Sequence, residues 1–286
     1  MFQRAVAVVL ALAYAAMARA ETPPAPVVNC GTVVDLPTRT ASVTRYSWLP
    51  GTSSEPAGVA VLLLVGGGGT LNIDSAGCPQ RLNHNILLRT ASLLRAAGMA
   101  TALVDAPSDW KGDEGLAGFR LDPAHAADLG QVVADLRQRS GAQTVWVIGH
   151  SRGSLSAANA AGRLSGGQAP AGVVLASPML NGEPSKRRPW VAQTVRDTGV
   201  LAYHGALLVV GHVADNCPRS LPEGLDAWAR GASAARVQVA RVTGGPQPVG
   251  RSSSLAACEV GQAHDFVDQD QVFAQGVLRF IQGGRF

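Results

Sequence analysis

Residues 144–153 read TVWVIGHSRG, an apolar run that leads into Gly149-His150-Ser151-Arg152-Gly153. An alanine-rich stretch with helical character follows, up to about residue 164. This order predicts a buried strand, a sharp turn and a helix, with Ser151 at the apex of the turn in a strained backbone conformation. Side chains two residues before and after the serine would collide where strand and helix cross, which explains the two flanking glycines. Ser151 is therefore the first candidate for a nucleophile.

The strand-then-helix pattern continues on both sides of this turn. Apolar runs typical of strands buried on both faces occur at residues 59–65, 100–104, 144–148, 172–176 and 206–210. Helical patterns occur at residues 82–97, at 125–136 after the pair Asp122-Pro123, and from about Asp265 to residue 281. Strands alternating with helices predict an α/β fold with a mostly parallel central sheet and helices on both faces. Residues 41–48 alternate polar and apolar side chains, which predicts an antiparallel edge strand.

The composition excludes several classes of protein. Of 286 residues, 47% are hydrophobic and 15% are charged, which excludes a highly charged disordered chain. The 24 basic and 20 acidic residues give a net charge of +4, and the nearest approach to a basic block is the short run at 186–188. Nucleic-acid binding is therefore not expected.

Residues 1–20 have the pattern of a secretory signal peptide. Arg4 supplies a positive head, residues 5–16 form an apolar run, and Ala18-Arg19-Ala20 matches the cleavage rule. The apolar run is too short to span the ~30 Å hydrocarbon core of a membrane as a helix. We expect cleavage after Ala20, a single mature domain of residues 21–286 without a stable membrane anchor, and a periplasmic or secreted location.

The glycine-flanked serine between strand and helix resembles the nucleophile elbow of the α/β-hydrolase fold superfamily. The resemblance covers residues 59–281 and is strongest to exported bacterial members whose elbow reads G-x-S-R-G. It implies the chain order nucleophile, acid, histidine. Asp215 follows the strand at 206–210, and His264 lies just before the last helix. The resemblance thus implies that Ser151 is the nucleophile, His264 the general base and Asp215 the acid that orients it.

Other residues compete for two of these roles. The rivals are Glu183 and Asp226 for the acid, and His150 and His212 for the base. Both of these histidines lie inside the motifs, where a histidine more often shapes a pocket or packs. Asp265 is adjacent to His264, and we expect it to be an acidic residue in the first turn of the last helix.

An oxyanion formed at the serine needs two backbone donors. One is expected to be the amide of Arg152, and the other an amide in the four glycines at 66–69, with Gly67 favoured over Gly68. The glycine run lacks both the Gly-Lys-Ser/Thr ending of a phosphate loop and the third glycine of a dinucleotide fingerprint. The Arg152 side chain has two possible roles: it contacts an anionic substrate, or it forms a salt bridge or lies in solvent.

Four cysteines lie in the predicted mature part, and an even count in an exported chain predicts disulfides. The sequence contains no C-x-x-C motif and no neighbouring His-Cys cluster, so a structural zinc site is not expected. We favour pairing Cys217 with Cys258, because that bridge would tie the Asp215 loop to the His264 loop. Cys30 and Cys78 would form the second bridge, and buried free thiols are the alternative.

Residues 177–205 connect two predicted strands and are too few for a large lid domain, so we expect a minimal lid or none. Trp110 and Trp190 are candidates for an apolar pocket, with core packing as the alternative. The sequence favours a carboxylic-ester hydrolase that acts on a small-molecule ester or acyl substrate through an acyl-enzyme. A peptidase or amidase with the same triad, and a non-catalytic binding protein of the same fold, stay open. No cofactor or metal is expected, and the oligomeric state is not predicted.

Overall fold

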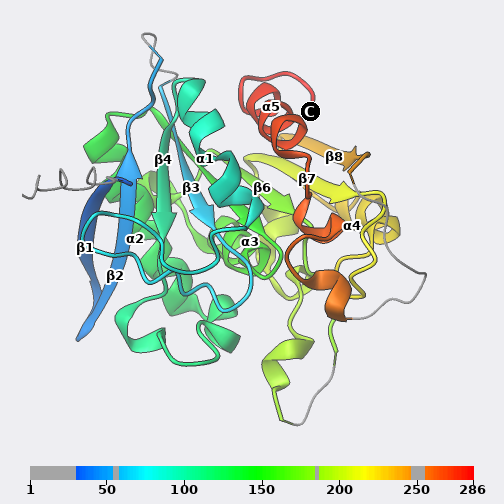
Figure 1. The fold of residues 1–286 in the computed structure, drawn as a ribbon, viewed down its shortest axis with the longest axis horizontal. Helices are drawn as coiled ribbons and strands as arrows, with labels where there is room; N and C mark the ends of the chain where they lie inside the picture. Colours follow the sequence, from blue (N-terminus) through cyan, green and yellow to red (C-terminus); the bar gives the residue numbers. More distant parts are fainter. Residues whose placement is uncertain (1–29, 54–57, 184–186, 246–254) are drawn as a thin grey trace, which may run out of the picture.

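The computed structural model describes residues 30–53, 58–183, 187–245 and 255–286, and eight strands in these ranges form one sheet (Figure 1). The strands are β1 (Thr32–Arg39), β2 (Ser42–Leu49), β3 (Val59–Leu64), β4 (Ala100–Val104), β5 (Thr144–His150), β6 (Gly172–Ala176), β7 (Ala206–His212) and β8 (Arg236–Val242). Their order is β1-β2-β4-β3-β5-β6-β7-β8. β1 and β2 run antiparallel to their neighbours, and all other pairs are parallel. The predicted fold class, an α/β fold with a mostly parallel sheet, is confirmed.

Helices cover both faces of the sheet. They are α1 (Ile86–Ala96), α2 (Pro123–Ser140), α3 (Gly153–Arg163), α4 (Leu225–Ala229) and α5 (Asp270–Ile281). Leu62 and Leu64 of β3 belong to the core that includes α2 and α3, whereas Val61 and Leu63 belong to the core that includes α1 and α5. Because both faces of β3 are covered, every position must be apolar, and the strand reads as a continuous apolar run.

The two edges of the sheet depart from the sequence-based expectation. Residues 41–48 were expected at an edge, but β2 lies between β1 and β4. The edges are β1 and β8, which no pattern indicated. Both edge strands leave several side chains exposed or half-buried, so polar residues such as Asp35 and Gln238 interrupt their apolar character. A strand covered on only part of its surface carries a weaker hydrophobic signal.

Helix starts follow local chemistry, with two corrections to the expected bounds. Asp122 accepts a hydrogen bond from the backbone of Ala124 and Pro123 opens α2, as predicted. The last helix begins at Asp270 rather than near 265, because Phe266 and Asp268 have φ values of +51° and +59°. α1 begins at Ile86 rather than 82, after an N-cap at Asn85.

The connection between β6 and β7 contains only 3-10 turns in its described part, at Pro189–Ala192, Val195–Asp197 and Gly199–Ala202. It projects from one side of the sheet, as the light green segment of Figure 1 shows. The expectation of a minimal lid is therefore confirmed for the described residues.

The four cysteines form two disulfides in the pairing that the sequence favoured, Cys30–Cys78 and Cys217–Cys258. The predicted signal peptide at residues 1–20 lies outside the described residues, so it stays a prediction, as does the single domain of residues 21–286. Within the described ranges, we find no helix that combines the length and the apolar character needed to cross a membrane.

Candidate active site

Ser151 lies at the apex of the turn between β5 and α3. Its φ is +54°, a left-handed conformation that a non-glycine residue rarely adopts. A Cβ on Gly153 would lie 1.9 Å from the carbonyl oxygen of Leu64, and a Cβ on Gly149 would lie 2.4 Å from that of Gly153. Gly149 therefore allows β5 and α3 to cross, as the sequence predicts, whereas Gly153 is required because α3 begins against the neighbouring strand β3.

Ser151, His264 and Asp215 lie in one hydrogen-bonded line. The Ser151 hydroxyl is 2.9 Å from His264 Nε2, and His264 Nδ1 is 3.0 Å from Asp215 Oδ2. All three residues are buried. An ionised carboxylate only accepts hydrogen bonds, so the proton of a neutral imidazole sits on Nδ1 and leaves Nε2 free to accept from the serine. The structure thus brings together the three residues predicted for the triad.

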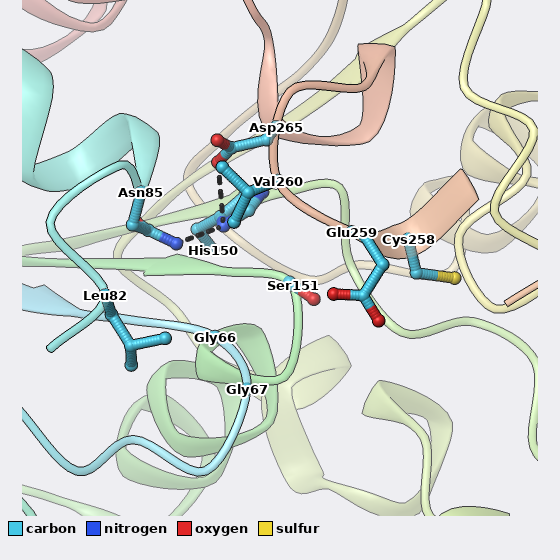
Figure 2. A pocket seen from close by; sticks show the side chains of 10 residues that line it. All are labelled: Gly66, Gly67, Leu82, Asn85, His150, Ser151, Cys258, Glu259, Val260 and Asp265. Atoms are coloured by element: carbon cyan, nitrogen blue, oxygen red, sulfur yellow. Dashed lines mark hydrogen bonds and ion pairs between the residues drawn. The ribbon is translucent and has the colours of Figure 1, made fainter. Parts of the chain in front are cut away.

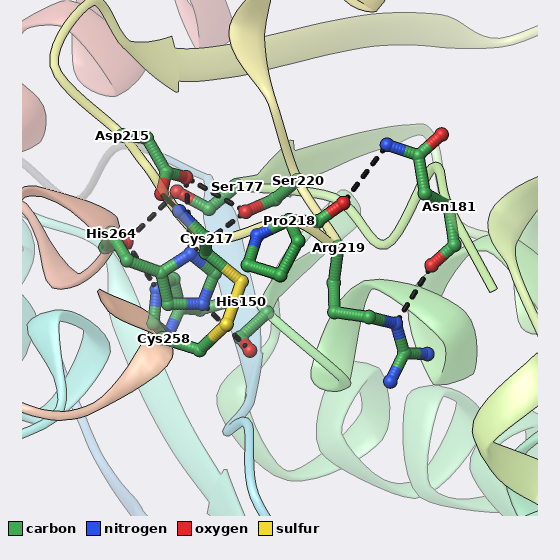
Figure 3. The surroundings of a disulfide bond; sticks show 11 residues. His150, Ser177, Asn181, Asp215, Cys217, Pro218, Arg219, Ser220, Cys258 and His264 are labelled. Carbon is green, nitrogen blue, oxygen red and sulfur yellow. Dashed lines mark hydrogen bonds and ion pairs between the residues drawn. A yellow bond between two sulfur atoms is a disulfide. The ribbon is translucent and has the colours of Figure 1, made fainter. Parts of the chain in front are cut away.

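Ser220 is part of this line although no sequence pattern indicated it. Its hydroxyl donates to Asp215 Oδ2 at 2.8 Å and lies 2.9 Å from His264 Nδ1 (Figure 3). The backbone amide of Cys217 donates to the other carboxylate oxygen at 2.9 Å. These two donors fix the orientation of the carboxylate toward the imidazole.

The backbone carbonyl of His264 is held by two side chains. Ser177 Oγ donates to it at 2.8 Å, and His150 Nε2 donates at 3.0 Å. The amide nitrogen of Asn85 donates to His150 Nδ1 at 2.8 Å, which fixes the neutral tautomer with hydrogen on Nε2. Burial lowers the pKa of His150 to about 4, so this ring is uncharged at neutral pH. His150 therefore holds the backbone of His264, the predicted base.

The remaining rivals for the acid and base are engaged elsewhere. His212 Nε2 donates to the carbonyl of Gly244, and Asp226 forms an ion pair with Arg241. Glu183 is exposed. Within the described ranges, none of the three side chains is hydrogen-bonded to a side chain of the predicted triad.

Asp265 requires a correction. It was expected in the first turn of the last helix, but it lies in a 3-10 turn before that helix. Its carboxylate accepts the backbone N–H of Ile86, the first residue of α1, at 3.0 Å, and it pairs with Arg89 at 2.8 Å. Asp265 thus satisfies an unpaired amide at the start of a different helix. These contacts also anchor the loop that carries the adjacent His264.

The glycine loop after β3 passes directly against Ser151. A Cβ on Gly66 would lie 3.3 Å from Ser151 Oγ. Gly66 and Gly67 line the cavity at Ser151, whereas Gly68 lines a neighbouring one. Within the described residues, the backbone amides of Gly67 and Arg152 have no protein acceptor. Both amides are therefore available to an oxyanion, and this geometry favours Gly67 over Gly68.

The cavity beside Ser151 has a volume of about 100 Å³ (Figure 2). Its lining includes the apolar side chains of Leu82 and Val260. Glu259 also lines it, and its carboxylate points toward Ser151 in Figure 2. A cavity of this size accommodates a short acyl group.

The two tryptophans and the Arg152 side chain lie outside this cavity lining. Trp110 stacks on Phe119 with ring centroids 4.6 Å apart, so packing is its observed role. The Arg152 guanidinium lies 3.9 Å over the Trp190 ring and donates to the carbonyl of Ala117 at 3.1 Å. Burial lowers the pKa of Arg152 to about 10, so it stays cationic at neutral pH.

One group of metal-ligand types occurs among the described residues. Ligand atoms of Asp215, Cys217 and His264 lie within 4.8 Å of one another. However, the Cys217 sulfur is bonded to Cys258, and His264 Nδ1 and Asp215 are hydrogen-bonded to each other. Because each of these atoms already has a bonded or hydrogen-bonded partner, the group does not fit a metal ion.

The Cys217–Cys258 bridge connects the Asp215 loop to the cavity wall at Cys258. Replacing both of these cysteines by serine is expected to lower the free energy of unfolding by about 4 kcal/mol, because the bridge closes a long loop. We also expect kcat to fall, since Asp215 and the Glu259 segment lose their common anchor. Urea unfolding and ester turnover measure the two effects.

The matched control is the Cys30→Ser/Cys78→Ser variant, whose bridge joins residues 48 apart compared with 41 for the other. It should lose similar stability and keep the wild-type kcat. Equal kcat values in the two double variants would contradict an active-site role for the Cys217–Cys258 bridge.

Two buried histidines predict a loss of stability on acidification. Burial lowers the pKa of His125 to about 3 and that of His150 to about 4. Histidines of the unfolded chain titrate near 6.5, so between this pH and about 4 the unfolded state binds more protons and stability falls as pH falls. His125→Gln should reduce the slope of the unfolding free energy against pH by about 1.4 kcal/mol per pH unit.

Urea unfolding of wild type and variant between pH 6 and about pH 4.5 tests this expectation. His84→Gln, at an exposed position, is the control and should keep the wild-type slope. An unchanged slope in His125→Gln would show that His125 is protonated in the folded state or that the site does not remain buried.

Comparison with known proteins gives a partial family match and many structural matches. The profile of the serine aminopeptidase family S33 matches residues 91–218, which include Ser151 and Asp215 and end before His264. Comparison with curated proteins found no match.

Similar solved structures cover nearly the whole chain. An α/β serine hydrolase homologue from Coxiella burnetii is 14% identical with a TM-score of 0.55, over 89% of this chain and 98% of that chain. An α/β serine hydrolase without lid from Xanthomonas campestris is 17% identical with a TM-score of 0.53, over 91% and 98%. Esterase 2 of Thermogutta terrifontis is 13% identical with a TM-score of 0.58, over 93% and 99%. The chain therefore has the α/β-hydrolase fold that its sequence predicts.

Proposed function

We propose that this protein is a serine hydrolase that cleaves carboxylic esters, with Ser151 as nucleophile, His264 as general base and Asp215 as the acid that orients the histidine. One observation carries the proposal. An unbroken hydrogen-bond chain runs from the Ser151 hydroxyl through both ring nitrogens of His264 to the Asp215 carboxylate. A serine hydroxyl is a weak nucleophile until an adjacent base accepts its proton, and this chain supplies the base.

In the proposed reaction, Ser151 Oγ bonds to the ester carbonyl carbon while its proton passes to His264 Nε2. The tetrahedral intermediate then collapses, His264 returns the proton to the leaving alkoxide oxygen, and an acyl-enzyme remains. Water, deprotonated by the same histidine, attacks the acyl carbon, releases the carboxylic acid and restores the serine. Asp215 stabilises the imidazolium that forms in both steps.

The negative oxygen of each tetrahedral intermediate is bound by backbone amides. We assign these donors to Gly67, which lines the cavity at Ser151, and to Arg152, which follows Ser151 in the chain; neither amide has an acceptor within the described protein. Such donors are fixed before reaction, so they stabilise the charge without reorganising. Glycine at 67 also suits its φ of +53°.

The substrate that fits best is a small ester with a short acyl group. The cavity at Ser151 is about 100 Å³ in volume, and the described connection between β6 and β7 forms no helical lid. Among the similar structures is an esterase of Thermogutta terrifontis with butyrate bound. The small cavity and this neighbour favour esters of about that acyl length.

A peptidase is the second candidate, since the matched family profile is that of serine aminopeptidases. Glu259 gives this candidate a structural basis. Its exposed carboxylate lines the cavity next to Ser151, where it could pair with the ammonium group of a peptide N-terminus.

Matched substrates separate the two candidates. p-Nitrophenyl butyrate and butyryl p-nitroanilide share one acyl group and differ in the bond cleaved, and an alanyl p-nitroanilide adds the ammonium group. An esterase should favour the butyryl ester over both anilides by more than about 1,000-fold in kcat/KM, with no loss in Glu259→Gln. Faster turnover of the alanyl anilide, with a loss in Glu259→Gln, would establish the peptidase. No turnover of any of the three would favour the binding protein.

We propose further that the enzyme works in the periplasm or outside the cell. The proposal rests on the signal-peptide pattern of residues 1–20 and on two disulfides, which persist in oxidising compartments. N-terminal sequencing of the protein from its native host should begin at Glu21. A mature chain that begins at Met1 would contradict export.

A further inference from the structure

Arg120 is a buried arginine without a carboxylate partner among the described residues. It lies in the 3-10 turn Ala117–Leu121, and only 1% of its surface is exposed. No ion pair with Asp or Glu is found for it in the part of the chain that the structure describes. Burial, followed by the nearby Arg152 charge, pushes the pKa of Arg120 well below its ordinary range, although a guanidinium keeps its proton in proteins. A buried unpaired charge is costly, which suggests that this one has a use.

The hydrogen bonds of Arg120 converge on the glycine loop beside the nucleophile. One terminal nitrogen donates to the carbonyls of Val65, Gly66 and Gly67, at 3.2, 3.4 and 3.2 Å. The other terminal nitrogen donates to Ser156 Oγ at 2.8 Å. Three successive peptide carbonyls thus turn toward one cation.

Peptide geometry then fixes where the amides of this loop point. The carbonyl of Gly66 and the N–H of Gly67 belong to one planar trans peptide, so they point in opposite directions. The Gly66 carbonyl accepts from the Gly69 N–H at 3.1 Å and from Arg120 at 3.4 Å, so it is held on the Arg120 side and the Gly67 N–H is turned away from Arg120. Gly67 lines the cavity at Ser151, so this is the direction in which an oxyanion would form.

The same contact strengthens the amide as a donor. A cation at the carbonyl oxygen polarises the peptide and increases the positive charge on its N–H, and such chains of hydrogen bonds reinforce one another in a low-dielectric interior. The Arg120 charge also lies one peptide away from the place where negative charge develops. Its stabilising effect therefore grows as the oxyanion forms.

The glycine loop at residues 66–69 leaves space for the Arg120 side chain. A Cβ on Gly69 would lie 2.6 Å from the Arg120 guanidinium, and Gly69 has a φ of +77°. Ser156, which binds the guanidinium, is also 2.9 Å from His125 Nε2, and His125 is uncharged at neutral pH because burial lowers its pKa to about 3. The charge that acts with burial to lower the pKa of Arg120 is that of Arg152, a second cation, and no carboxylate pairs with Arg120 within the described residues.

From these contacts we infer that Arg120 is a positioning residue for the oxyanion hole: it orients and polarises the Gly66–Gly67 peptide and supplies positive charge behind it. The inference rests on the proposed function, since it requires an oxyanion at Ser151. It predicts a specific loss of transition-state stabilisation when the guanidinium is removed, with ground-state binding of the ester preserved.

The test compares Arg120→Met and Arg120→Lys with wild type in kcat, KM and the affinity for an alkyl boronic acid that forms a tetrahedral adduct with the serine. Arg120→Met should lower kcat by about 100-fold, leave KM within about threefold, and weaken boronic-acid binding in proportion to kcat. Ser156→Ala is the control. It removes a hydrogen bond of the guanidinium but leaves the loop contacts, and kcat should stay within about threefold of wild type.

Arg120→Lys supplies a readout that a merely structural role would not give. A buried lysine releases its proton well below its ordinary pKa of about 10.4. Activity should therefore be partly rescued at low pH and lost as pH rises, over a range where wild type stays active. This variant decides the question alone if Arg120→Met does not fold.

The outcomes separate this inference from the proposed function. Wild-type kcat and boronic-acid affinity in folded Arg120→Met, or a wild-type pH profile in Arg120→Lys, would overturn the role of Arg120 alone. A wild-type protein that neither hydrolyses esters nor binds the boronic acid covalently would overturn the proposed function and this inference together.

Discussion

Replacing Ser151 by alanine is expected to lower kcat for ester hydrolysis by about 10⁵-fold, because the variant has no oxygen that can form the acyl-enzyme. The remaining rate comes from amides and binding groups that still surround the ester. The fold should persist, since the change removes one atom, Oγ, whose hydrogen bond goes to His264. Hydrolysis of p-nitrophenyl butyrate and thermal unfolding measure activity and stability on the same samples.

Ser154→Ala is the matched control for this variant. Ser154 is also buried, lies three residues further along in α3, and accepts a hydrogen bond from the Met179 amide at 3.2 Å. It should lose some stability and keep a kcat close to wild type. If Ser151→Ala retained more than about 1% of wild-type activity, Ser151 could not be the nucleophile.

Replacing Gly153 by alanine is expected to cost at least about 3 kcal/mol of unfolding free energy, a large effect for one methyl group. The new Cβ would meet the Leu64 carbonyl oxygen at 1.9 Å and the Val65 carbonyl oxygen at 2.8 Å. Both contacts are with backbone, so β3 and α3 must move apart. That movement also shifts the nearby Ser151, and a misplacement of about 1 Å can lower kcat by about 100-fold.

Gly167→Ala provides the comparison for Gly153→Ala. A Cβ at Gly167 would have nothing within 4 Å, and the residue is exposed. Its stability should stay within about 0.5 kcal/mol of wild type. Urea unfolding of both variants is the measurement, and equal midpoints would contradict the close contact between β3 and the start of α3.

The predictable parts of the fold are the elements determined by their own residues and immediate neighbours in the sequence. β3 and β5 are covered on both faces, so they read as apolar runs, and the elbow required glycines at 149 and 153. The edge strands β1 and β8 are only half covered, and their register depends on a neighbour far along the chain. The start of α5 was missed because left-handed residues at 266 and 268 interrupt a sequence that otherwise has helical periodicity.

The residues of the candidate site also fall into those with a recognisable sequence signal and those without one. Ser151, Asp215 and His264 each follow a strand or precede a helix in a recognisable order, and the structure brings them within hydrogen-bond distance. No sequence motif distinguishes Ser220 or Arg120. Each is a single polar residue whose partners come from other segments, so only the folded chain reveals its contacts.

The central claim is that Ser151 is acylated during turnover, and the most direct test is the mass of the enzyme during the reaction. The mature protein is mixed with p-nitrophenyl butyrate, quenched in acid within the first turnovers, digested and mapped by mass spectrometry. We predict one butyryl group, on the peptide that contains Ser151, and none in Ser151→Ala. Rapid ester hydrolysis without a butyryl group on that peptide, or with one on another residue, would contradict the account.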